Sequence, residues 1–169
     1  MSLLEDYAAI AGNDVVDHLQ QLASLLSNRK VVHINSTRIG GGVAEILSKL
    51  VPLSKALGLD VQWEVITGEG MFFDCTKAMH NALQGSRASI HPRLLALYED
   101  TNAANAERLR DLLNEADFVI VHDPQPAPLI RHFPSRRGKW IWRCHIDASR
   151  PFRPVWKYLH RHVSIVSVR

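Results

Sequence analysis

Three short polar segments follow apolar runs of the sequence, and each holds residue types that could bind a sugar or an anion. Glycines occupy positions 40–42, His122 and Asp123 are adjacent, and His145 stands two residues before Asp147. A carboxylate accepts hydrogen bonds from sugar hydroxyls, and an imidazole donates to a hydroxyl or stabilises a developing positive charge. Glycine backbone N–H groups at a helix N-terminus favour an anion such as phosphate.

Each segment also has a structural alternative. The glycines at 40–42 could form a flexible tight turn. Asp123 precedes Pro124 and could cap a helix, as could Asp147. A lone histidine such as His145 is often structural, but we favour a functional role because it is expected to share a rim with Asp123 and the glycines. Neither Asp123 nor His145 lies in an apolar run, so we expect their replacement to leave the fold intact.

The elements that must position these residues follow from the apolar periodicity. Strands are predicted over residues 31–35, 61–66, 118–121 and 140–143, with a further strand over 163–168. Helices are predicted over 15–26, with Asp14 as the cap, and over 43–53, 72–83, 94–113 and 151–162. Alternating strands and helices indicate an α/β fold, a Rossmann-like parallel sheet flanked by helices. Ligands bind beyond the carboxyl ends of such strands, which is where all three polar segments fall.

Composition excludes several classes of protein. The 169 residues favour one domain, and 46% hydrophobic residues suffice for a core. The net charge of +3 is small and scattered, so neither nucleic acid nor a membrane is expected as a partner. We interpret the basic segment from Arg131 to Lys139 as a solvated turn. Cys75 and Cys144 are far apart, which fits reduced thiols in a cytoplasmic protein. The N-terminus lacks the pattern of a secretory signal.

Common cofactor motifs are missing. The nine histidines show no H-E-x-x-H or other tight ligand spacing, so no metal site is predicted. The glycine run is not G-x-G-x-x-G, which disfavours a dinucleotide-dependent oxidoreductase, and the P-loop motif is absent. We therefore expect no cofactor.

Several blocks of sequence, in order and without large gaps over roughly residues 31–159, resemble one known family. The blocks are VVHINST (31–37) with GGGVAEIL (40–47), HNALQG (80–85), VHDPQP (121–126) and WRCHID (142–147). They are similar to the opening part of the retaining trehalose synthases, which transfer glucose from a nucleotide sugar. The resemblance implies the N-terminal half of a GT-B glycosyltransferase, in which two Rossmann-like domains face each other across a cleft.

The resemblance also implies roles for individual residues. Residues 31–169 would form the acceptor-side domain, preceded by an N-terminal helical extension over 1–30. Gly41 and Gly42 would lie near the donor phosphates. His145 would touch the donor glucose and, with Asp123, form the catalytic pair; Asp123 would also hydrogen-bond the acceptor glucose. Two further residues, Asn81 and Gln84, would line the acceptor pocket.

The implied reaction joins glucose to a nucleoside diphosphate glucose and gives trehalose with the α configuration retained, without a metal. Because the C-terminal donor domain is expected to be absent from this chain, we expect the chain to be inactive alone. The alternative is a free-standing sugar-binding or regulatory module derived from such an enzyme. The oligomeric state stays open, and the sequence allows a homodimer.

Overall fold

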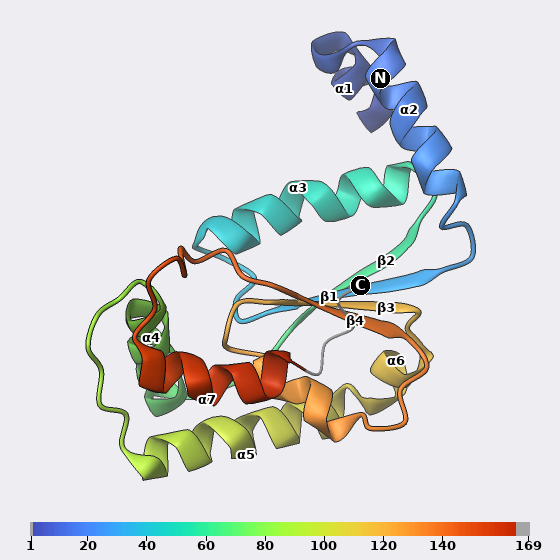
Figure 1. Ribbon diagram of the computed structural model, residues 1–169. Coiled ribbons are helices and arrows are strands. Elements are labelled where there is room, and N and C mark those ends of the chain that lie inside the picture. The colour runs from blue at the N-terminus through green and yellow to red at the C-terminus, as the bar shows by residue number, and fades with distance from the viewer. Residues whose placement is uncertain (1, 165–169) are drawn as a thin grey trace.

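The computed structural model describes residues 2–164 and contains a four-stranded, all-parallel sheet (Figure 1). The strands run in the order β2-β1-β3-β4, and their bounds are Lys30–Asn35 for β1, Asp60–Val65 for β2, Phe118–His122 for β3 and Lys139–Arg143 for β4. The predicted Rossmann-like α/β fold is therefore confirmed. Of the further strand predicted over 163–168, Val163 ends a helix, and residues 165–168 lie outside the described part of the chain.

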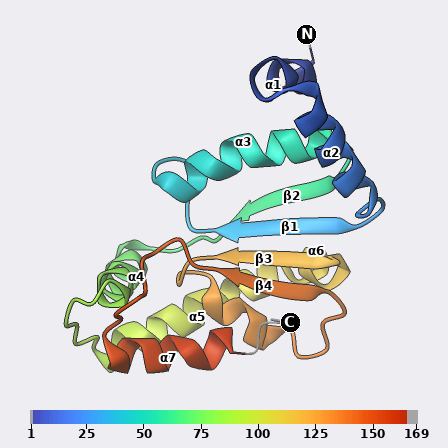
Figure 2. The same ribbon diagram turned by 45° about the horizontal axis from the view of Figure 1, so that its top comes forward.

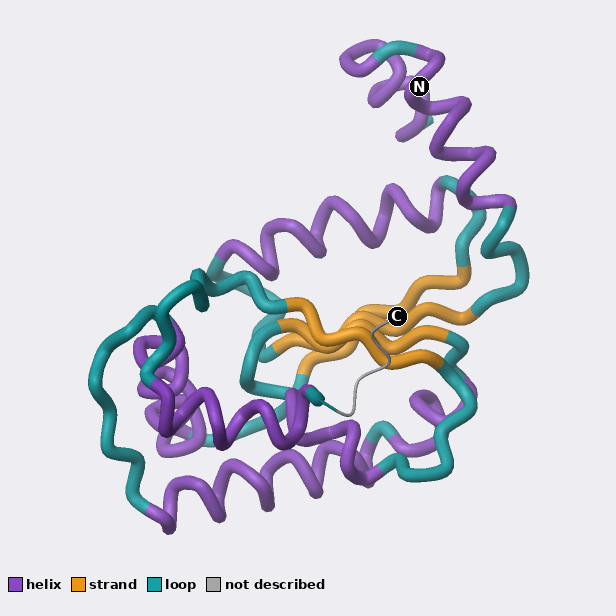
Figure 3. Tube along the Cα trace, in the orientation of Figure 1, coloured by secondary structure: helices purple, strands orange, loops and turns teal. Residues whose placement is uncertain are grey.

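Helical segments precede β1, fill the connections between the strands and follow β4 (Figure 3). They are α1 (Leu3–Ala11), α2 (Asn13–Ser24), α3 (Gly42–Ala56), α4 (Gly70–Leu83), α5 (Pro92–Arg108), α6 (Arg110–Glu115), the 3₁₀ helix η1 (Ala127–His132) and α7 (Arg153–Val163). None of these helices is long and apolar enough to cross a membrane.

Two helix boundaries differ from the prediction. The single helix predicted over 94–113 is broken at Leu109, whose backbone leaves the helical region while its side chain is buried in the core. The packing of Leu109 in the core thus ends α5 at a point where the helical spacing of apolar residues in the sequence continues. The prediction that Asp14 caps α2 is also wrong, because the cap position is Gly12 and Asp14 lies in the first turn. Gly12 has φ +97°, a conformation that suits glycine, and it separates α1 from α2.

Alternating residues of each strand face two different helical layers. Val32 and Ile34 of β1 point into the larger core, whereas Val31 points into the smaller one beneath α3. Figures 1 and 2 show α3 on one face of the sheet and α4, α5 and α7 on the other. The larger core holds the fully buried side chains Phe72, Tyr98 and Trp140. Because both faces of β1 are covered, the strand reads as a continuous apolar run with one histidine.

Replacing Gly138 with alanine is expected to lower the free energy of unfolding by about 1–3 kcal/mol. A Cβ at Gly138 would stand 2.1 Å from the carbonyl oxygen of Ala116 and 2.9 Å from that of Asp117, so the backbone before β3 or β4 would have to shift. Gly42→Ala is the matched control, because a Cβ there meets no atom within 4 Å. Urea denaturation of both variants tests this, and equal stability of Gly138→Ala and Gly42→Ala would contradict it.

Candidate functional site

A cavity of about 430 Å³ opens at the carboxyl ends of β1 and β3, beside the start of α3. The predicted polar segments meet there, as the rule for parallel sheets requires. Residues lining it include Gly41, Gly42, His80, Asp123, Gln125 and His145. The volume falls within the range of small-molecule sites.

The glycine segment ends in the cap of α3. Gly40 and Gly41 have φ values of +78° and +83°, and Gly41 occupies the cap position without a side-chain hydrogen bond to the helix. The first N–H groups of α3 are therefore left for another acceptor. A Cβ added at any of the three glycines would meet nothing within 4 Å, so the space in front of the loop is open. Helix dipole and free N–H groups together favour an anion there.

Side chains from β1 and β2 hold the start of this loop. The buried Asn35 donates through Nδ2 to the carbonyl oxygen of Thr37 at 2.7 Å and accepts through Oδ1 from Trp63 Nε1 at 2.8 Å. The Arg38 guanidinium lies 4.4 Å from the centre of the Trp63 ring and donates to the Trp63 carbonyl. These contacts fix the direction in which the chain leaves β1.

Asp123 links the ends of β3 and β4. Its Oδ1 accepts the backbone N–H of His145 at 2.7 Å, its own N–H donates to the Arg143 carbonyl at 2.9 Å, and its carbonyl accepts from Trp142 Nε1 at 2.8 Å. Its backbone has φ +63°, which is uncommon for a residue other than glycine. Burial raises the pKa of the Asp123 carboxyl, and the hydrogen bond from His145 opposes that rise.

The helix-cap alternatives for the two aspartates are both wrong. The helical turn after Asp123 begins only at Ala127, with Pro126 at its cap position. Asp147 accepts from the backbone N–H of Ser149 at 3.0 Å, whereas α7 begins at Arg153. Asp123 therefore holds the loop after β4, and Asp147 closes a small turn further along the same loop.

Helix α5 supports the turn that follows Asp123. The buried Tyr98 donates its hydroxyl to the Pro124 carbonyl at 2.5 Å, and Asn102 donates through Nδ2 to the Gln125 carbonyl at 3.0 Å. Both donors are buried, so their bonds to the turn are protected from water. The turn is held from the core side, and Gln125 lines the cavity.

Three histidines form a hydrogen-bonded chain from the interior to the cavity. His33 Nδ1 lies 3.0 Å from His122 Nε2, and His122 Nδ1 lies 2.8 Å from His145 Nε2. Burial, followed by the charge of Arg143, lowers the pKa of His33 to about 4. Burial, followed by the neighbouring His33, His145 and Arg143, lowers the pKa of His122 to about 3. Both inner rings are therefore neutral at pH 7. Sequence reasoning did not predict the hydrogen bonds between these three histidines. The only indication in the sequence was a histidine inside the apolar run of β1.

Not every predicted site residue lines the cavity. Gly41, Gly42, Asp123 and His145 come together, whereas Asn81 and Gln84 are exposed at the end of α4 and outside it. Their role in acceptor binding stays a prediction. His80 of the same helical turn does line the cavity, although sequence reasoning did not single it out. The signal available in the sequence was that His80 begins the HNALQG block (80–85), one of those that resemble the trehalose synthases.

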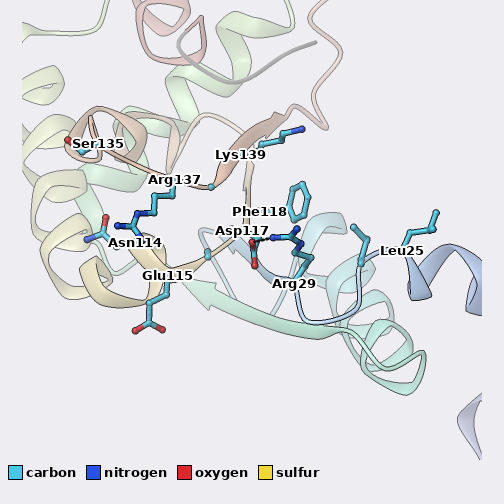
Figure 4. Close-up of a pocket in the computed structure, with 12 residues that line it drawn as sticks. Leu25, Arg29, Asn114, Glu115, Asp117, Phe118, Ser135, Arg137 and Lys139 are labelled. Carbon is cyan, nitrogen blue, oxygen red and sulfur yellow. Dashed lines mark hydrogen bonds and ion pairs between the residues drawn. The ribbon is translucent and has the colours of Figure 1, made fainter.

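A larger hollow of about 820 Å³ lies at the opposite end of the sheet (Figure 4). Its walls carry Arg29 and Asp117, which form an ion pair at 2.8 Å, and Lys139 at the amino end of β4. We take the smaller cavity as the candidate functional site because ligands of parallel α/β sheets bind at the carboxyl ends. Within residues 2–164, no group of three or more His, Cys, Asp or Glu side chains could hold a metal ion.

A parallel sheet flanked by helices, with a glycine-capped helix at its carboxyl end, defines a Rossmann-like domain, consistent with the N-terminal domain of a GT-B protein. The family described as trehalose synthase, N-terminal domain, matches residues 33–168. The chain therefore belongs to this family of trehalose synthase N-terminal domains.

Individual relatives agree with the family. The chain is 47% identical to the trehalose synthase of Thermococcus litoralis and 46% identical to that of Rubrobacter xylanophilus, with 95% of this chain covered in each case. It is also 30% identical to the trehalose phosphorylase of Pleurotus pulmonarius over 98% of its length. The chain spans 38%, 39% and 25% of these three relatives, respectively.

Proposed function

We propose that this chain is the acceptor-side part of a glycosyltransferase that moves glucose from a nucleoside diphosphate glucose to glucose and forms trehalose with retention. Its relatives are trehalose synthases and trehalose phosphorylases, so the family transfers glycosyl groups in trehalose metabolism. The observation that carries the proposal is that the N-terminus of α3, Asp123 and His145 all line one cavity.

The glycine loop would bind the donor diphosphate. The leaving diphosphate gains negative charge as the glycosidic bond breaks, and the N–H groups of Gly41, Gly42 and the first turn of α3 would stabilise it without a metal. The open space in front of the glycines would let the phosphates approach the backbone closely. The loop needs no rearrangement for this role, since the free N–H groups already start the helix.

Asp123 and His145 would act on the sugars. Oδ1 of Asp123 accepts from the His145 N–H, and none of residues 2–164 donates a hydrogen bond to its other carboxylate oxygen. That oxygen would accept hydrogen bonds from the hydroxyls of the acceptor glucose. His145 would contact the donor glucose and assist as its transition state becomes similar to an oxocarbenium ion. Asn81 and Gln84 would contact the acceptor only at its outer side, given their exposed position.

A trehalose phosphorylase would use the same glycine loop for inorganic phosphate. The higher identity to trehalose synthases, 47% against 30% for the phosphorylase, favours the synthase reaction. Replacing the nucleotide sugar by phosphate plus trehalose in the assay separates the two reactions, because only a phosphorylase releases glucose 1-phosphate.

The 169-residue chain alone is expected to bind glucose or trehalose weakly and to form no trehalose. A chimera that joins residues 1–164 to the remaining part of the Rubrobacter xylanophilus trehalose synthase is expected to form trehalose from glucose and a nucleoside diphosphate glucose, because transfer needs donor and acceptor held together. Product analysis tests both, with chain and chimera at equal concentration. Robust synthesis by the chain alone would refute its role as one half of the enzyme. A folded but inactive chimera would contradict the proposed reaction.

A further inference from the structure

The histidine chain connects a residue of the sheet interior to the cavity through ring nitrogens only. His33 lies in the middle of β1, His122 ends β3, and His145 follows β4. The two rings of each pair meet edge to edge with a small angle between their planes, 26° for His33 with His122 and 21° for His122 with His145. His33 and His122 are 6% and 3% exposed, so water cannot readily replace the bonds between the rings.

The proton positions on the three histidine rings depend on one another. A neutral imidazole carries one N–H and one bare nitrogen. If His33 holds its proton on Nδ1, it donates to Nε2 of His122, which must then hold its own proton on Nδ1 and donate to Nε2 of His145. If the direction is reversed, all three protons sit on Nε2. Any mixture places two N–H groups or two lone pairs face to face at 3.0 or 2.8 Å, which leaves buried groups unsatisfied.

We infer that His33 and His122 are positioning residues that orient the His145 ring and force all three rings into one common tautomer. Nε2 of His145 is occupied by His122, so Nδ1 is the ring nitrogen left for a ligand in the cavity that His145 lines. In the common Nδ1–H form, this atom is a hydrogen-bond donor to the ligand, and in the common Nε2–H form it is an acceptor. The tautomer that His145 shares with the two buried rings therefore determines whether it donates to a ligand or accepts from one.

Backbone contacts hold His145 independently of the ring chain. Its N–H is fixed by Asp123 at 2.7 Å, so loss of the ring contact should leave the loop in place. This separation makes the inference testable: replacement of His122 should change the proton position on His145 without displacing its backbone. The consequence for sugar binding rests on the proposed function, whereas the common tautomer does not.

Nitrogen-15 NMR of the histidine rings tests the inference on the 169-residue chain at pH 7.5. Two-bond correlations between ring nitrogens and ring protons report which nitrogen carries the proton. We expect His33, His122 and His145 to show the same tautomer, each with one form dominant. In His122→Phe, which retains a ring of similar shape, we expect His145 to lose the single tautomer and show a mixture, while the backbone amide signal of His145 stays close to its position in the unmodified chain.

His18→Phe is the control, because His18 is exposed on α2 and should leave all three rings unchanged. Opposite tautomers on two adjacent rings of the unmodified chain would overturn the inference, as would a single retained tautomer of His145 in a folded His122→Phe variant.

If His122→Phe does not fold, the measurement on the unmodified chain still decides. His33→Phe then provides the second variant, in which His122 and His145 are expected still to share one tautomer. No sugar or turnover enters the measurement, so a failed glucose-transfer assay would not affect the result.

Discussion

Asp123→Ala is expected to raise the KM for glucose by about 10- to 100-fold in an enzyme that joins this domain to a donor-binding half. A hydrogen bond between a carboxylate and a sugar hydroxyl contributes about 1.5–3 kcal/mol, and each 1.4 kcal/mol corresponds to about tenfold in affinity. The effect should be large because the carboxylate is partly buried at the edge of the cavity, where water competes less for it. Steady-state kinetics with varied glucose measure it.

The structure predicts a cost to stability as well, which the sequence did not indicate. Alanine at position 123 would leave the His145 N–H without its acceptor and would have to adopt the backbone conformation with φ +63°. We expect the free energy of unfolding to fall by about 1–3 kcal/mol, as when a hydrogen-bond partner of a partly buried group is removed. Urea denaturation of the 169-residue chain measures this loss separately from catalysis.

Asp123→Asn separates the two roles. Asparagine tolerates a positive φ and retains a side-chain oxygen for the His145 N–H, but it has no negative charge. It should keep most of the stability and still raise the KM for glucose. Asp147→Ala is the matched control, since this exposed carboxylate bonds only locally, to Ser149, and should leave the KM unchanged. A folded Asp123→Asn variant with an unchanged KM would remove Asp123 from the acceptor site.

Acid is expected to destabilise the chain well before its carboxylates are protonated. The folded-state pKa values of His33 and His122, about 4 and about 3, lie below the ordinary value of 6.5. Between these limits the unfolded chain binds more protons than the folded chain, so stability falls as the pH decreases. Full stability is present above about pH 7, and linkage predicts a loss of about 2 kcal/mol per histidine between pH 7.5 and pH 5, or about 4 kcal/mol for both.

Urea unfolding at pH 7.5 and at pH 5 tests this dependence. His122→Phe removes one of the two groups, so we expect the acid-induced loss to shrink to about half, even though the variant differs in absolute stability. His18→Phe should keep the full loss, because His18 is exposed. A chain equally stable at both pH values, or a His122→Phe variant with the full acid dependence, would show that burial does not keep these rings neutral.

Much of the fold could be predicted from the sequence because its signals are local. Short apolar runs rich in β-branched residues mark β1 and β3, and the glycines at 40–42 mark the junction between β1 and α3. Alternation of strands with helices implies parallel strands, and parallel strands bring their carboxyl ends together. The meeting of the glycine loop, Asp123 and His145 therefore followed from the sequence before any contact was known.

Contacts between segments were decided only by the tertiary structure. The break at Leu109 does not interrupt the helical pattern, because it depends on how that side chain packs in the core. In the β1–β3 register, His33 lies opposite Ile120, and in the β3–β4 register His122 lies opposite Arg143. Residues two apart on a strand share a face, so His122 reaches the ring of His33 on the neighbouring strand and that of His145 beyond β4. Each histidine is unremarkable within its own segment. Their hydrogen bonds exist only because two strand registers and one loop place three rings in line, and local periodicity carries no information about register between distant strands.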